Sequence, residues 1–248
     1  MTKDEKIAKL GKEITDRATV LLGKDKITPE SPEYLGINSA LKYTAYKYDQ
    51  KMADDILDIC LTMKKRVPLT IEQLAKKNPQ FDREYLEKAM QAVSESGLVE
   101  FHWENLDGKN PNHEKRWVLD MFVPGSAEIM MINPEQSDMY PETADFFERM
   151  AYLPLAGITE MVPPGGAGIG MHVIPVEKAI PAESKSLPIE HLSHWLKKYE
   201  GHIGVSVCSC RKQQRIRGEG SGDVEGEWCI GVGDFADYCR ETNHGRDI

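Results

Sequence analysis

Apolar side chains near the start of the chain recur every three or four positions, which is the spacing of one helix face. Ile7, Leu10 and Ile14 open this pattern and predict a helix over 3–21. The stretch 24–38 that follows carries two prolines and a glycine, which interrupt regular structure. We therefore expect a helix followed by a loop.

The clearest pattern lies between residues 51 and 133. It predicts a helix, a short helix that begins after Thr70, and a third helix that Asp82 caps. Two apolar runs, 98–103 and 116–123, follow with a polar loop between them and predict a hairpin. Helix, short helix, helix and hairpin is the order of a winged helix-turn-helix domain. The Ser-Glu-Ser-Gly-Leu-Val-Glu phrase that leads into the first strand is typical of that family.

The remainder of the chain mixes turns, strands and helices. We expect a helix over 188–199, a strand over 203–207 that leads into the first of four clustered cysteines, and a last helix over 231–243. The pattern as a whole predicts the α+β class. The expected parts are an N-terminal helical segment at 1–50, a winged-helix-like domain at 51–133, and a small α/β domain that bears the cysteines at 134–248.

Charge weighs against a nucleic-acid partner. The 40 acidic residues outnumber the 31 basic ones, so the formal net charge is -9, whereas nucleic-acid affinity comes mainly from basic side chains. The helix that would enter the DNA groove is itself acidic. Its charged residues are Asp82, Glu84, Glu87 and Glu95 against Arg83 and Lys88. We therefore expect no DNA partner, and we expect this domain to dock other proteins.

The apolar runs and the first residues of the chain indicate where in the cell we expect the protein. No apolar run approaches the ~20 residues that span a bilayer, and the first residues lack the apolar stretch of a signal peptide. We therefore expect a cytoplasmic protein with no membrane partner, in a compartment where thiols stay reduced.

Four of the five cysteines lie close together in the sequence. In a reducing compartment, such a group indicates a metal or redox site rather than a disulfide framework. Cys60 stands apart, on the apolar face of its helix, and we expect it in the core. The clustered residues, which we take as candidate metal ligands, are Cys208, Cys210, Cys229 and Cys239.

The Cys-x-Cys pair leaves a predicted strand, where a turn can direct both sulfur atoms to one point. Thiolates are soft ligands that suit iron–sulfur clusters and zinc, and we favour an iron–sulfur cluster with zinc as the alternative. A redox dithiol and unrelated buried thiols remain open. Cys239 is the weakest of the four candidates, and His244 is a possible substitute for it.

Four cations follow the Cys-x-Cys pair with no acid between them. Cations at this place would lower the thiol pKa values and offset the negative charge of a thiolate-bound cluster. We expect Arg211 and Arg215 to lie beside the cofactor, and Lys212 and Arg217 complete the group.

The motifs around these cysteines resemble a module of iron–sulfur oxidoreductases of anaerobic bacteria and archaea. The resemblance covers about residues 45–248 and is carried by Ile174-Pro-Val-Glu-Lys-Ala-Ile-Pro, Leu187-Pro, Val207-Cys-Ser-Cys-Arg211, Cys229 and Gly245-Arg-Asp-Ile. It implies a 4Fe-4S cluster, an electron-transfer role without a catalytic centre in this chain, and a chain that is a fragment of something longer.

The same resemblance implies partners. Ferredoxin-like dicluster domains follow this module in the family. Some members continue into a flavin- and pyridine-nucleotide-dependent domain similar to the small subunit of glutamate synthase. Family members often carry a further cysteine in the glycine-rich stretch that is Gly218-Glu-Gly-Ser-Gly-Asp here, and this chain has none. The number of cluster ligands is therefore open.

Overall fold

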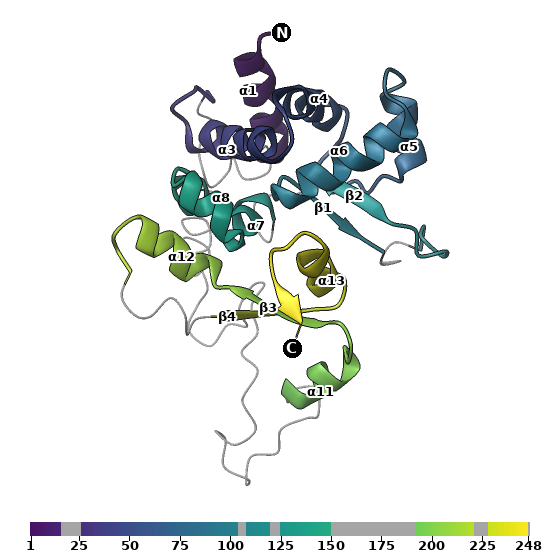
Figure 1. The fold of residues 1–248 in the computed structure, drawn as a ribbon, viewed down its shortest axis with the longest axis vertical. Helices are drawn as coiled ribbons and strands as arrows, with labels where there is room; N and C mark the ends of the chain where they lie inside the picture. The colour runs from purple at the N-terminus through teal and green to yellow at the C-terminus, as the bar shows by residue number, and fades with distance from the viewer. Residues whose placement is uncertain (16–25, 104–107, 120–124, 150–191, 221–227, 248) are drawn as a thin grey trace, which may run out of the picture.

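A computed structural model describes residues 1–15, 26–103, 108–119, 125–149, 192–220 and 228–247. Over these ranges the chain is a helix-rich α+β protein with one two-stranded and one three-stranded sheet, both antiparallel, which confirms the predicted class. Figure 1 shows helices gathered at the N-terminal end and the three-stranded sheet toward the other. Among the described helices, none has the length and apolar character that crossing a bilayer requires.

The N-terminal end is a group of packed helices. Ile7 and Leu10 of the first helix are fully buried, as the spacing predicts. The helices are α1 (Lys3–Thr15), α3 (Pro32–Lys47) and α4 (Gln50–Cys60).

Helix α3 begins inside the stretch that was expected to be a loop, so that prediction is wrong from Pro32 onward. Pro32 lies at the start of the helix, directly after Ser31, where its missing N–H is not needed and its fixed φ favours the helix. Gly36 lies inside the helix, and only a glycine fits there because the Phe146 ring occupies the space that a Cβ would need. Two of the three residues that suggested a loop, Pro32 and Gly36, therefore have a place in the helix.

The next block has the predicted order of helix, short helix, helix and hairpin. The caps are as expected: Thr70 and Gln73 form a capping box, and the Asp82 carboxylate accepts from the Tyr85 N–H at 2.8 Å. The arrangement as a winged helix stays a prediction. Beyond α4 the elements are α5 (Ile71–Lys77), α6 (Arg83–Glu95), β1 (Val99–His102) and β2 (Arg116–Leu119).

The rest of the described chain contains a second sheet with the strand order β4-β3-β5. Strand β3 has the predicted bounds, whereas β4 and α12 were not predicted, and the last helix begins later than residue 231. The elements are α7 (Ser126–Ile132), α8 (Pro134–Met139), α9 (Thr143–Phe147), α11 (Leu192–Lys198), β3 (Ile203–Val207), α12 (Ser209–Ile216), β4 (Trp228–Val232), α13 (Asp234–Glu241) and β5 (Arg246–Asp247).

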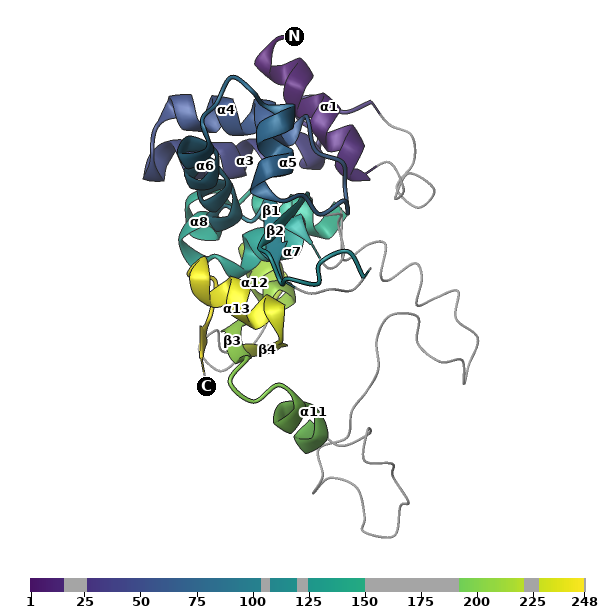
Figure 2. The same cartoon turned by 90° about the vertical axis from the view of Figure 1, so that its right-hand side faces the viewer.

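Helix α13 joins the second sheet to the hairpin. Figures 1 and 2 both place it against β1. The fully buried Tyr238 donates to the Ser94 carbonyl oxygen at 2.7 Å, and its ring meets Phe101 edge-on with 5.0 Å between centroids. One core of buried apolar side chains thus runs from Ile7 to Cys239, while the three-part division of the chain stays a prediction.

Candidate functional site

Three of the candidate cysteines lie where β3, α12 and β4 meet. Cys208 is the N-cap of α12 and directly follows β3, and Cys210 lies in the first turn of that helix. Cys229 is the second residue of β4 and pairs in register with Ser206. The sequence predicted a turn after the strand, and the structure places the start of a helix there.

The three thiols lie close enough to affect one another. The Cys229 thiol is hydrogen-bonded with Cys208, and the charges of Cys208 and Cys210 also act on it. Burial and then these neighbours raise the pKa of Cys229 to about 12, and burial followed by Cys208 raises the pKa of Cys210. All five cysteines are free thiols. Metal binding here would therefore release protons.

Cys239 lies apart from these three, on the inward side of α13. It is only 4% exposed and belongs to the hydrophobic core. Burial raises the pKa of its thiol, followed by the carboxylates of Glu100 and Glu128. The structure thus brings together Cys208, Cys210 and Cys229 and leaves Cys239 packed in the interior.

His244, the possible substitute for Cys239, is bonded elsewhere. Its Nε2–H donates to the Glu95 carbonyl oxygen at 3.0 Å, because a carbonyl can only accept, and its Nδ1 lies 2.8 Å from Thr242 Oγ1. Complete burial lowers its pKa to about 4. His244 therefore fastens the C-terminal segment to α6.

Two of the four cations after the Cys-x-Cys pair hold α12 in place. Lys212 pairs with Asp138 on α8, and Arg217 pairs with Asp145 on α9. These pairs dock the helix that presents Cys210, and the effect that we expect of the four cations on a cofactor stays a prediction. The two that we expected beside the cofactor are the exposed Arg211 and the half-buried Arg215.

A carboxylate that sequence reasoning missed faces the same region. Helix α7 packs against α12, and its half-buried Glu128 contributes to the raised pKa values of Cys210, Cys229 and Cys239. Glu128 lies 80 residues before Cys208 (208 − 128) and no motif links the two. Only the packing of the helices reveals it.

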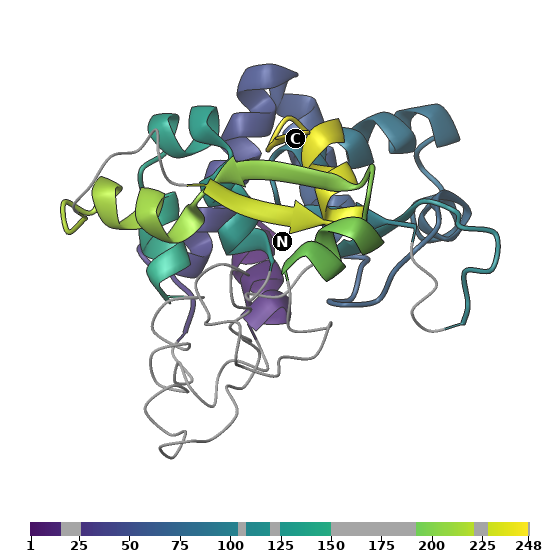
Figure 3. The same ribbon diagram turned by 90° about the horizontal axis from the view of Figure 1, so that it is seen from below.

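The outer face of the second sheet, next to Cys229, is apolar and exposed. Trp228, Ile230 and Val232 are 45%, 51% and 36% exposed, and Figure 3 shows this sheet toward the viewer. On the opposite face α13 packs close to Gly231, since a Cβ there would lie 3.3 Å from the Phe235 ring. The cysteine site thus borders an open apolar surface.

Among the residues that the structure describes, no three Cys, His, Asp or Glu side chains lie close enough together to hold one metal ion. The three thiols thus form a neighbouring group rather than a closed ligand shell. No family model, no curated protein and no solved structure matches this chain.

Proposed function

We propose that this chain is an iron–sulfur electron-transfer module of an anaerobic oxidoreductase, with Cys208, Cys210 and Cys229 as cluster ligands. The observation that supports this most is the meeting of three thiols from a strand end, a helix start and a second strand. Thiolates are the usual ligands of iron–sulfur clusters. The resemblance of the surrounding motifs to anaerobic iron–sulfur oxidoreductases supports the same reading.

The thiols of Cys208, Cys210 and Cys229 would supply three of the four ligands of a 4Fe-4S cluster once their side chains close around it. When bound, such a cluster would accept and release single electrons. Cys239 would serve as the fourth ligand only if its buried side chain left the core. Arg211 and Arg215 are the cations that we expect beside the cluster, where their charge would offset that of the thiolates and raise the reduction potential.

The partners that we propose are ferredoxin-like domains or subunits and flavin- and pyridine-nucleotide-dependent domains. They would supply the substrate chemistry, and this chain would pass electrons to or from them. The proposal rests on the family resemblance, in which such domains follow the cysteine module.

For the block α4 to β2, we propose a winged-helix arrangement that docks proteins. Charge supports this over DNA binding, because Arg83 on α6 is held by the carboxylates of Glu72 and Glu87. A cation engaged in this way is a poor phosphate contact.

The test is metal analysis of anoxically purified protein, with iron, sulfide and zinc measured together and an electron paramagnetic resonance spectrum after reduction. We expect iron and sulfide in the wild-type chain and a loss of most of both in Cys208→Ser and Cys229→Ser. Cys60→Ala is the matched control, because Cys60 is fully buried in α4 and should leave the iron content unchanged.

Two outcomes would contradict the proposal. Stoichiometric zinc without iron would favour the alternative of a regulator or adaptor with a structural zinc. A protein that takes up no iron even after anoxic reconstitution with iron and sulfide would exclude a cluster.

A further inference from the structure

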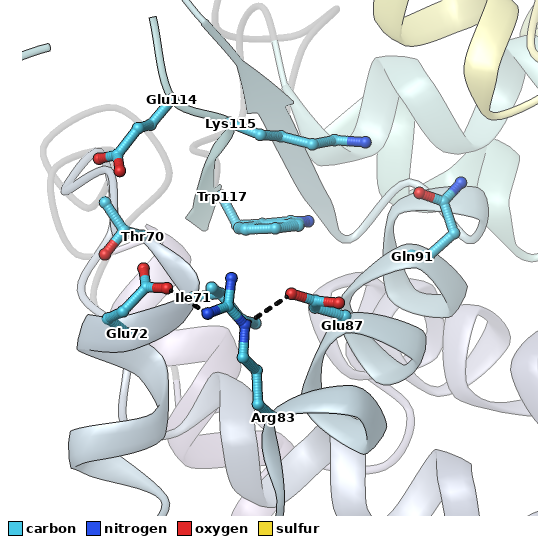
Figure 4. A pocket seen from close by; sticks show the side chains of 9 residues that line it. All are labelled: Thr70, Ile71, Glu72, Arg83, Glu87, Gln91, Glu114, Lys115 and Trp117. Atoms are coloured by element: carbon cyan, nitrogen blue, oxygen red, sulfur yellow. Dashed lines mark hydrogen bonds and ion pairs between the residues drawn. The ribbon is translucent and has the colours of Figure 1, made fainter. Parts of the chain in front are cut away.

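A cavity of about 420 Å³ lies between α5, α6 and β2, away from the cysteine-bearing strands in the fold (Figures 1 and 4). Its volume falls in the range of ligand-binding sites. Three residues on one face of α6, namely Arg83, Glu87 and Gln91, line one side of it. Lys115 and Trp117 line the opposite side.

The cations that line the cavity are already engaged. The Arg83 guanidinium lies between two carboxylates, with Nη1 2.9 Å from Glu72 Oε1 and Nε 3.0 Å from Glu87 Oε1. Lys115 Nζ lies 2.9 Å from Glu241 Oε2. The cavity therefore already contains one guanidinium bound between two carboxylates. Because Arg83 and Lys115 are both ion-paired, they would bind an added anion only weakly.

The carboxylates that line the cavity exceed its cations by one. Glu114 is exposed, and no ion pair of its carboxylate occurs within the described ranges. With Glu72 and Glu87 it makes three acids against Arg83 and Lys115, so the lining has a formal charge of −1 (2 − 3). A cation is favoured here, and a nucleic-acid phosphate is repelled.

A second, independent feature is an unpaired donor. Trp117 is 6% exposed, and its indole Nε1–H has no hydrogen-bond partner in the described part of the chain. Figure 4 shows the nitrogen end of the indole directed toward the space between Lys115, Gln91 and Glu87. A buried donor without an acceptor is unfavourable, and a carbonyl oxygen placed in this space would satisfy it.

We propose that this cavity binds a basic residue, arginine or lysine, of a protein partner. The cationic side chain of the partner would lie near Glu114. A backbone carbonyl of the same partner segment would accept from the Trp117 indole N–H after the Lys115 side chain moves aside. A free cation lacks the carbonyl and a nucleic acid lacks the positive charge, so a basic peptide segment fits both features. The proposal is independent of the cysteine site.

The test uses N-acetylarginine amide as the probe and the indole N–H signals of ¹⁵N-tryptophan-labelled protein as the readout. The chain has four tryptophans, and Trp117→Phe identifies the signal of interest by its loss. We expect saturable movement of the Trp117 signal with the arginine probe. N-acetylcitrulline amide, which has the same shape without the charge, should bind markedly more weakly.

A matched pair of variants locates the contact. Glu114→Gln should weaken binding of the arginine probe about two- to fivefold, as expected for one exposed ion pair. Glu84→Gln makes the same charge change on an exposed residue of α6 that does not line the cavity, and it should leave binding unchanged. Three results would overturn the proposal: no movement of the Trp117 signal, equal binding of the citrulline probe, or movement of that signal by duplex DNA instead.

Discussion

Apolar side chains are buried at the helical end of the molecule but exposed on the outer face of the cysteine-bearing sheet. Ile56 on α4 is 1% exposed, whereas Ile230 on β4 is 51% exposed. In the helices, apolar positions face inward and form the core. In the sheet, one face meets α13 and the other presents Ile230 and its neighbours to the outside.

This difference in burial shows which apolar positions the stability of the fold alone can explain. Burial of apolar area is the main favourable term in folding, so the helical pattern needs no other cause. An exposed apolar strand beside three thiols gains little from folding. Contiguous exposed apolar surface is typical of contact surfaces, and this stretch is where the proposed electron-transfer site lies.

The largest effect should come from Ile56→Ala. Truncating a fully buried isoleucine removes its burial energy and leaves a cavity, so we expect a loss of about 3 kcal/mol in the free energy of unfolding. Urea unfolding followed by circular dichroism measures it. A loss below about 1 kcal/mol would mean that the helical end is loosely packed and that the contrast between the two regions is weaker than described.

The helical end could largely be predicted from the sequence because its signals are local. Thr70 and Asp82 begin their helices as predicted, since a cap acts within one turn. The start of α3 does not follow from the sequence pattern because a proline usually interrupts a helix, whereas Pro32 lies at the first helical position, where it favours one.

Around the site, the elements that were missed depend on distant contacts. Helix α12 is very polar and is docked by the ion pairs of Lys212 and Arg217 to α8 and α9, which no local pattern reveals. Strand β4 is short and pairs with β3 from more than twenty residues away. The spacing of Cys208 and Cys210 indicated the site, whereas Glu128 reaches it only through helix packing.

The second prediction concerns His244, which connects the two regions. Burial lowers its folded pKa to about 4, below the unfolded value near 6.5, so the folded state binds fewer protons between these pH values. Its contribution is fully present above pH 6.5 and is lost as the pH falls toward 4. At pH 5 the loss should be about 2 kcal/mol.

The measurement compares wild type with His244→Gln, in which an amide can still donate to the Glu95 carbonyl oxygen but does not titrate. Chemical unfolding of both proteins at pH 7 and pH 5 separates this contribution from that of the carboxylates, which both share. Equal pH dependence in the two proteins would show that His244 is accessible to protons in the folded state.

The smallest effect should come from Ile230→Ala, the counterpart of Ile56→Ala on the open face of the sheet. Because the side chain is half exposed, its truncation removes little buried area, and we expect a loss of about 0.5 kcal/mol. Urea unfolding at two protein concentrations, with sedimentation velocity on the same samples, measures it. A loss close to that of Ile56→Ala would mean that this face is covered in solution. If the loss also grew with protein concentration, the cover would be a second copy of the chain, because dissociation would then accompany unfolding.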